Sequence, residues 1–183
     1  AGTVVVPDKT VALSGTAAVL AAALNGTVQD VSGDAITGTV TITGDNPTGT
    51  ELSVINNGTN ASIILPSKAF QLSGTAQELA EALAGTVTDS NGDKISGDLA
   101  SGNSIYVNSG DELTPAQLQT INNNVGGGRI RIRDSHSDFS GTAAVLSEAF
   151  DSTTGARVTG PAANSLTGNV TITGANPTVD ELV

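Results

Sequence analysis

The stretch LSGTAAVLAAALNG, residues 13–26, returns as LSGTAQELAEALAG at residues 72–85 and as FSGTAAVLSEAFDS at residues 139–152. A catalytic site needs one copy of its residues, whereas a protein that grows by stacking needs the same segment in every unit. The copies therefore predict one repeat domain over residues 1–183, with units of roughly 60–65 residues that start near residues 8, 67 and 134. The third unit stops in mid-repeat, which predicts a segment of a longer tandem array.

Each copy predicts a short amphipathic helix, because Ala and Leu recur at helical spacing after its Ser-Gly-Thr triplet. A second motif occupies residues 43–58, 108–124 and 173–183. Each version contains a Thr-x-x-Glu/Gln capping box, in which the threonine hydroxyl and the acidic or amide side chain bind the first backbone N–H groups of a helix. The three boxes are Thr48 with Glu51, Thr114 with Gln117, and Thr178 with Glu181. The second motif therefore predicts another short helix in each unit.

Six runs with strand character lie between the helices, at residues 3–8, 39–44, 62–67, 104–109, 129–134 and 169–174. A helix lies in every connection between them, and such connections join parallel strands with a right-handed crossover. Val40 and Ile42 alternate with threonines, which indicates one buried and one solvated sheet face. The sequence predicts an α/β fold: a right-handed α/β solenoid with a sequential parallel sheet and short helices on one face. The alternative, a doubly wound sheet, requires strands that are apolar throughout.

The composition limits the partners of this chain. Its 183 residues include seven basic and eighteen acidic residues, and the net charge of −11 repels nucleic acid and anionic membranes. No run of about 18 apolar residues predicts a membrane span. There is no cysteine for disulfides or thiolate metal sites, and the low aromatic content of 2% leaves a core of Val, Ile, Leu and Ala. We expect neither nucleic-acid binding nor membrane insertion.

The acidic, Thr-, Asn-, Gly- and Ala-rich copies of LSGTAxxLAxAL and GDxIxGxVxITG resemble the tandem repeats of very large bacterial cell-surface proteins, of the kind found in marine cyanobacteria and other aquatic bacteria. The resemblance implies export to an extracellular, cell-surface location, a role as surface layer, spacer or adhesin stalk, and calcium dependence. The stacking of units makes neighbouring repeats of the same polypeptide the first expected partners. End-to-end self-association and surface glycans are the further partners that we consider.

The segment DSNGDKISGD at residues 89–98 has the oxygen ligands of a calcium loop at positions one, three and five: Asp89, Asn91 and Asp93. The corresponding segment of the first unit keeps Asp30 and Asp34. Lys94 stands where such a loop needs glycine, and no glutamate follows at position twelve. Asp, Asn, Ser and Gly also favour plain turns. A calcium site and a plain turn are therefore both open, and no cofactor is required.

A second candidate site is the outer face of the strands at residues 104–109 and 129–134. Arginine forms two parallel hydrogen bonds with a carboxylate or sulfate, so this face predicts binding of an acidic glycan or a protein partner. The residues that would bind are Tyr106, Arg129, Arg131 and Arg133. The alternative is charge balance with Asp111, Asp134 or Asp138.

Two further patterns carry less chemistry. Threonine rows are spaced as on ice-binding surfaces, but Tyr106 and the arginines interrupt them, and threonine is a common strand residue; the rows are Thr39, Thr41 and Thr43, with Thr171 and Thr173. The single histidine, His136, has Ser137 and Asp138 as sequence neighbours, but a catalytic triad is defined by spatial geometry. The sequence therefore predicts a non-enzymatic structural or interaction repeat. The alternative is a binding module that uses the open sheet face for glycan, ice or protein.

Overall fold

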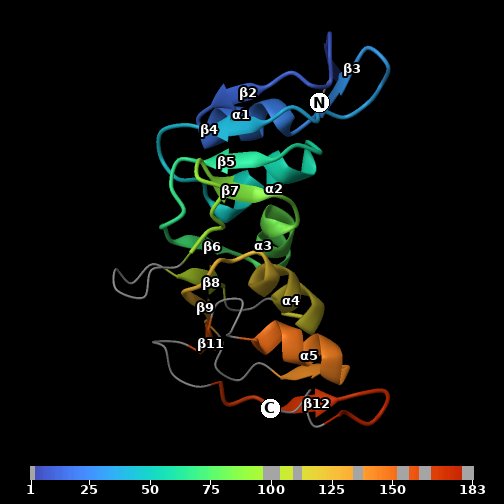
Figure 1. The fold of residues 1–183 in the computed structure, drawn as a ribbon, viewed down its shortest axis with the longest axis vertical. Coiled ribbons are helices and arrows are strands. Elements are labelled where there is room, and N and C mark those ends of the chain that lie inside the picture. Colours follow the sequence, from blue (N-terminus) through green and yellow to red (C-terminus); the bar gives the residue numbers. More distant parts are fainter. Residues whose placement is uncertain are drawn as a thin grey trace.

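Five short helices follow the repeat motifs in the computed structural model, which describes residues 3–96, 104–108, 113–133, 138–151, 157–160 and 166–178. Each helix contacts the next one along the chain, and Figure 1 shows them in a column beside the strands. They are α1 (Ala17–Leu24), α2 (Gly49–Asn57), α3 (Ala76–Leu83), α4 (Pro115–Asn123) and α5 (Ala143–Phe150). Within the described part of the chain, none has the length and apolar character needed to cross a membrane.

Capping boxes begin three of these helices, α2, α3 and α4. Both boxes at Thr48 and Thr114 are confirmed: the threonine hydroxyl accepts from the backbone N–H three residues on, and the partner side chain binds the threonine N–H. Glu181, the partner predicted for Thr178, lies outside the described residues. Thr75 and Glu78 form a further box at α3 that the sequence comparison had not singled out.

All six predicted strands are confirmed: β1 (Thr3–Val6), β4 (Val40–Ile42), β5 (Ile63–Leu65), β8 (Ile105–Val107), β9 (Arg129–Ile132) and β12 (Val170–Ile172). Six more strands flank α1, α3 and α5. They are β2 (Leu13–Gly15), β3 (Thr27–Asp30), β6 (Leu72–Gly74), β7 (Val87–Asp89), β10 (Phe139–Gly141) and β11 (Arg157–Thr159). Each of these has a single apolar residue, whereas each predicted strand has at least two, so alternation does not reveal them in the sequence.

The strands form four parallel sheets among the described residues, so the prediction of one sequential six-stranded sheet is wrong. The orders are β1-β3, β2-β4-β5-β7, β6-β8-β9-β11 and β10-β12. β4 pairs with β5 and β8 with β9, as predicted, but β5 and β8 lie in different sheets. The reason is that α3 is flanked by two strands of its own: β7 extends the ladder of β5, while β6 starts the ladder of β8. We call β2-β4-β5-β7 the first sheet and β6-β8-β9-β11 the second sheet.

The core is a single buried cluster between the strands and the helices, built from Leu, Ile, Val and Ala as the composition predicts. Val40 and Ile42 of β4 are 0% and 2% exposed, whereas Thr41 between them is half-buried. The repeat-equivalent residues of β12, Val170 and Ile172, are 57% and 38% exposed. β4 is paired on both sides, by β2 and β5, whereas within the described residues β12 has β10 alone as a neighbour. Burial at this position therefore depends on a following strand.

Candidate functional site

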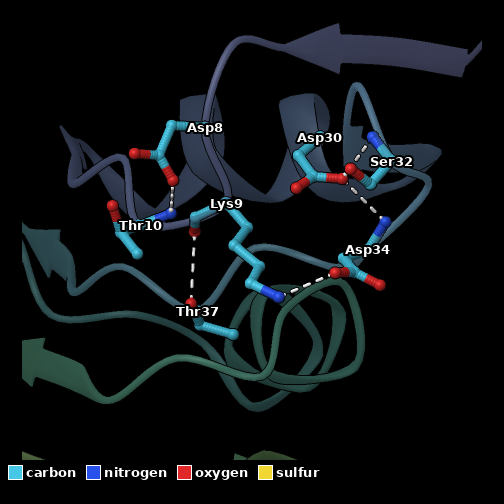
Figure 2. Close-up of polar contacts among 7 residues, drawn as sticks. All are labelled: Asp8, Lys9, Thr10, Asp30, Ser32, Asp34 and Thr37. Carbon is cyan, nitrogen blue, oxygen red and sulfur yellow. Dashed lines mark hydrogen bonds and ion pairs between the residues drawn. The ribbon is translucent and has the colours of Figure 1, made fainter.

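The first predicted site is a tight turn whose backbone N–H groups bind the side chain of its first residue, Asp30 (Figure 2). Its Oδ1 accepts hydrogen bonds from the backbone N–H groups of Ser32 at 2.8 Å and Asp34 at 2.9 Å. The turn needs Gly33, whose φ of 86° lies in the left-handed region that glycine adopts without strain. The Asp30 carboxylate therefore satisfies the backbone of its own turn.

Lys9 ties this turn to the loop that precedes β2. Its Nζ lies 2.7 Å from Oδ2 of Asp34, and the hydrogen bond to that carboxylate raises the pKa of Lys9 above its usual 10.5. The carbonyl of Lys9 accepts from the backbone N–H groups of Thr37 at 2.8 Å and Gly38 at 3.1 Å. Figure 2 shows the ammonium lying against the carboxylate, in the place where a bound cation would neutralise it.

The second unit repeats this arrangement. Oδ1 of Asp89 accepts from the backbone N–H groups of Asn91 at 2.8 Å and Asp93 at 3.0 Å, and Lys68 pairs with the Asp93 carboxylate. The hydrogen bond from the Asp93 N–H is the main reason why the pKa of Asp89 lies below its usual value. Lys94, which occupies the glycine position of a calcium loop, donates instead to the carbonyl of Asn123 at 2.6 Å.

The third unit has no aspartate at the position that closes this turn. Val158 lies opposite Ile130 as Val87 lies opposite Ile63, so Gly160 falls at the position of Asp89. Asp151, which sequence comparison aligns with the turn aspartates, is instead the C-cap residue of α5. Within the described residues, the aspartate-closed turn therefore occurs in the first two units.

The predicted calcium residues lie in two separate turns. The first turn contains Asp30 and Asp34, and the second contains Asp89, Asn91 and Asp93. The plain-turn interpretation accounts for the contacts of Asp30 and Asp89, and lysine is the partner of Asp34 and Asp93. Within the residues that the structure describes, no group of three or more His, Cys, Asp or Glu side chains is placed to hold a metal ion. At each turn the geometry supports a structural role: a lysine–aspartate ion pair joins the turn to a neighbouring loop.

The second predicted site is assembled on the outer face of the second sheet. Tyr106 of β8 lies directly opposite Arg131 of β9, whose Nη1 donates to the tyrosine hydroxyl at 3.2 Å. The guanidinium carbons of Arg131 and Arg133 lie 5.5 Å and 5.3 Å from the centroid of the tyrosine ring. These distances are typical of cation–π contacts, so Tyr106 holds two arginines in place.

Sequence analysis missed a fourth arginine of this face. Arg157 of β11 lies directly opposite Arg129 in the parallel register. Neighbouring strands are roughly 4.8 Å apart, so two like charges directly opposite each other repel. The alternation in Arg-Val-Thr was the available signal, but three residues do not define a strand. We call the set the arginine face: Tyr106, Arg129, Arg131, Arg133 and Arg157.

The first sheet shows that the repeat does not require these arginines. Ile63 pairs with Val40 as Ile130 pairs with Ile105, which makes the two sheets equivalent position by position. The positions of Arg129, Arg131, Arg133 and Arg157 are occupied in the first sheet by Ser62, Ile64, Pro66 and Thr86. The cationic residues are therefore a specific feature of the second sheet.

The charge-balance interpretation finds no support among the described residues. Their two ion pairs are Lys9–Asp34 and Lys68–Asp93, neither of which involves an arginine. Asp138, a predicted counter-ion, accepts instead from the backbone N–H of Asn169 at 2.6 Å. Asp111 and Asp134 lie outside the described residues. Within the part of the chain described, the Nε atoms of Arg129 and Arg131 are buried without a hydrogen-bond partner.

The threonine rows do not form one surface. Thr41 lies in the first sheet between Ser14 and Ile64, and Thr171 lies opposite Ser140 in the β10-β12 pair. Ile64 therefore interrupts the row on the first sheet. His136 lies outside the described residues.

The fold defines the class of this protein as α/β, with parallel sheets joined through short helices and a cationic outer face on the second sheet. No family model, curated protein or solved structure matches the chain.

Proposed function

We propose that the chain is a structural repeat segment of a large exported cell-surface protein, where it serves as a spacer or adhesin stalk, and that its units wind as a right-handed α/β solenoid. The observation that carries this proposal is that the same four-stranded parallel topology is built twice, by the first sheet and by the second sheet. A structure in which each unit contacts its neighbours can be extended by adding units.

Equivalent hydrogen bonds between helices support this proposal. Ser53 of α2 donates to the Glu81 carboxylate of α3 at 2.8 Å, and Gln119 of α4 donates to the equivalent Glu148 of α5. Asn56 donates to the carbonyl of Glu81 at 2.6 Å. Its equivalent Asn122 donates to the α5 carbonyls. These contacts join α2 to α3 and α4 to α5 in the same way, so each pair of helices forms a similar unit.

Small-angle scattering tests the stacked shape. A globular chain of this length has a radius of gyration of about 16 Å, and a stack of thin units is expected to exceed it clearly. The spacer role is tested by placing the chain between a cell-surface anchor and a reporter, which it should hold away from the membrane by its own length. A radius of gyration at the globular value would contradict the proposal.

A second function, ligand binding on the open face of the second sheet, is favoured by one specific observation. The arginine face gathers four of the chain's seven basic residues on one sheet of an acidic protein. Chromatography on immobilised glycans tests it, because a spacer is not retained, whereas a binding module is retained and loses retention when Arg131 is replaced by alanine.

A further inference from the structure

We propose that the arginine face binds the sulfate or carboxylate groups of an anionic polysaccharide, with Arg129 and Arg157 as its central clamp. This inference rests on the second function proposed above, because it names the ligand of that sheet face. The experiment below separates failure of the ligand from failure of the binding function.

The opposed pair of Arg129 and Arg157 is the first argument. Their side chains leave neighbouring parallel strands at paired positions. This arrangement places two permanent positive charges side by side, and their repulsion is an energetic cost that strand pairing does not require. An oxyanion placed between them replaces repulsion with charge-assisted hydrogen bonds to both guanidinium groups. Arg129 and Arg157 therefore offer two neighbouring cationic groups that one oxyanion can bind at the same time.

The extent of the cationic row points to a polymer rather than a single small ion. Arg129 and Arg131 lie on the same face of β9 at an interval of roughly 6.6 Å, and Arg133 follows directly after the strand. Arg157 adds a charge on the neighbouring strand, and Tyr106 orients the guanidinium groups of Arg131 and Arg133. A linear chain with repeated anionic groups contacts several of these positions at once.

A second copy of the chain is the other anionic partner to consider, and several of its described carboxylates are already engaged. Glu51 and Glu78 bind the backbone at the starts of α2 and α3. Asp34 pairs with Lys9, and Glu81 accepts from Ser53, Asn57 and Gln77. Pairing two copies through these four carboxylates would therefore break existing hydrogen bonds. A polysaccharide brings anionic groups without this cost.

The test measures binding of the whole chain to three polymers at low ionic strength: dextran sulfate, a polyuronate as the carboxylate probe, and uncharged dextran. We expect binding to at least one of the two anionic polymers, weakening as salt rises, and none to uncharged dextran. Inorganic sulfate should compete only at concentrations well above that of polymer-borne sulfate. Competition at equal concentration would overturn the polymeric ligand.

Each variant replaces an arginine of the second sheet by the residue at the equivalent position of the first sheet. The same fold therefore already contains that residue at that position. R129S and R157T should each weaken binding at least tenfold, which corresponds to about 1.4 kcal/mol for one charged hydrogen-bonded contact. K94S removes the same charge from an exposed site off the arginine face and is the matched control. Circular dichroism of each variant confirms folding before binding is compared.

Several outcomes would overturn the proposal. An equal loss for K94S and R157T would show that net charge alone drives binding. Retention on uncharged dextran that is lost in R131I would overturn the anionic ligand but leave sheet-face binding intact. Absence of retention on every glycan, together with concentration-dependent dimers that R129S abolishes, would identify a second copy as the partner.

Discussion

Replacing Asn122 by alanine is expected to destabilise the contact between α4 and α5 by about 3 kcal/mol. The side chain of Asn122 is 1% exposed. Its amide donates to the carbonyls of Glu148 at 3.2 Å, Ala149 at 3.3 Å and Asp151 at 2.7 Å. These carbonyls lie at the end of α5, where the last carbonyls of a helix run out of helical N–H partners; the Glu148 carbonyl also accepts from the backbone N–H of Asp151 at 3.4 Å. Asn122 therefore caps a neighbouring helix from inside the core.

The magnitude follows from these contacts. A net hydrogen bond contributes about 1 kcal/mol, and a buried acceptor left without a partner costs about 1–3 kcal/mol. The amide has two N–H groups, so alanine removes two hydrogen bonds of about 1 kcal/mol each and leaves the buried Ala149 carbonyl without a described donor, and a loss of about 3 kcal/mol is expected. The equivalent residue Asn56 makes one such bond and is half-buried. Because water reaches the carbonyl that it leaves, N56A should cost only about 1 kcal/mol.

Urea unfolding followed by circular dichroism measures these losses, since the chain has no tryptophan for fluorescence. N123A is the matched control, because Asn123 is exposed next to Asn122. N122D keeps the side-chain size but sets a carboxylate against carbonyl oxygens, so it should cost more than N122A at pH 7. A stability for N122A within about 0.5 kcal/mol of N123A would refute the proposed capping role.

Three further predictions concern the caps and the carboxylates. T75A should cost about 1 kcal/mol in urea unfolding, whereas T16A should cost less, because Thr75 makes a side-chain capping bond and Thr16 makes none. The Thr75 backbone N–H lowers the pKa of Glu78 below its usual 4.5, so its stabilising contribution is present above that value and is lost as pH falls below it; thermal melting between pH 7 and pH 3 should show a smaller drop for E78Q. Calcium or a chelator should leave the melting midpoint unchanged, since the Lys68 ammonium already pairs with Asp93; a midpoint raised by several degrees with calcium would restore the metal interpretation.

The helices were predictable because their signals are local. Thr48 and Thr114 lie three residues before Glu51 and Gln117, and a capping box needs nothing outside that span. The contact between Tyr106 and Arg131 also followed the predicted order, since β8 and β9 are consecutive strands joined through α4. Features that depend on one helix start or on one strand–helix–strand connection could therefore be predicted from the sequence.

Arg157 shows where this reasoning ended. Its place beside Arg129 depends on β11, a strand whose three residues alternate but are too few to define a strand by themselves. β11 forms a strand because it pairs with β9. The connection between these two strands includes β10 and α5. The same holds for the two strands on either side of α3: β6 begins the second sheet and β7 ends the first sheet.

By itself, the sequence determined the starts of α2 and α4, six of the strands and which residues of β4 face the core, because propensity, capping and periodicity act within a few residues. The tertiary structure alone decided which strands pair, how many sheets result, and that four arginines share one face. Strand pairing joins segments 23 to 33 positions apart, as between Val40 and Ile63 or Leu72 and Ile105. Its outcome depends on where each helix returns the chain to the sheet, which no short stretch of residues encodes.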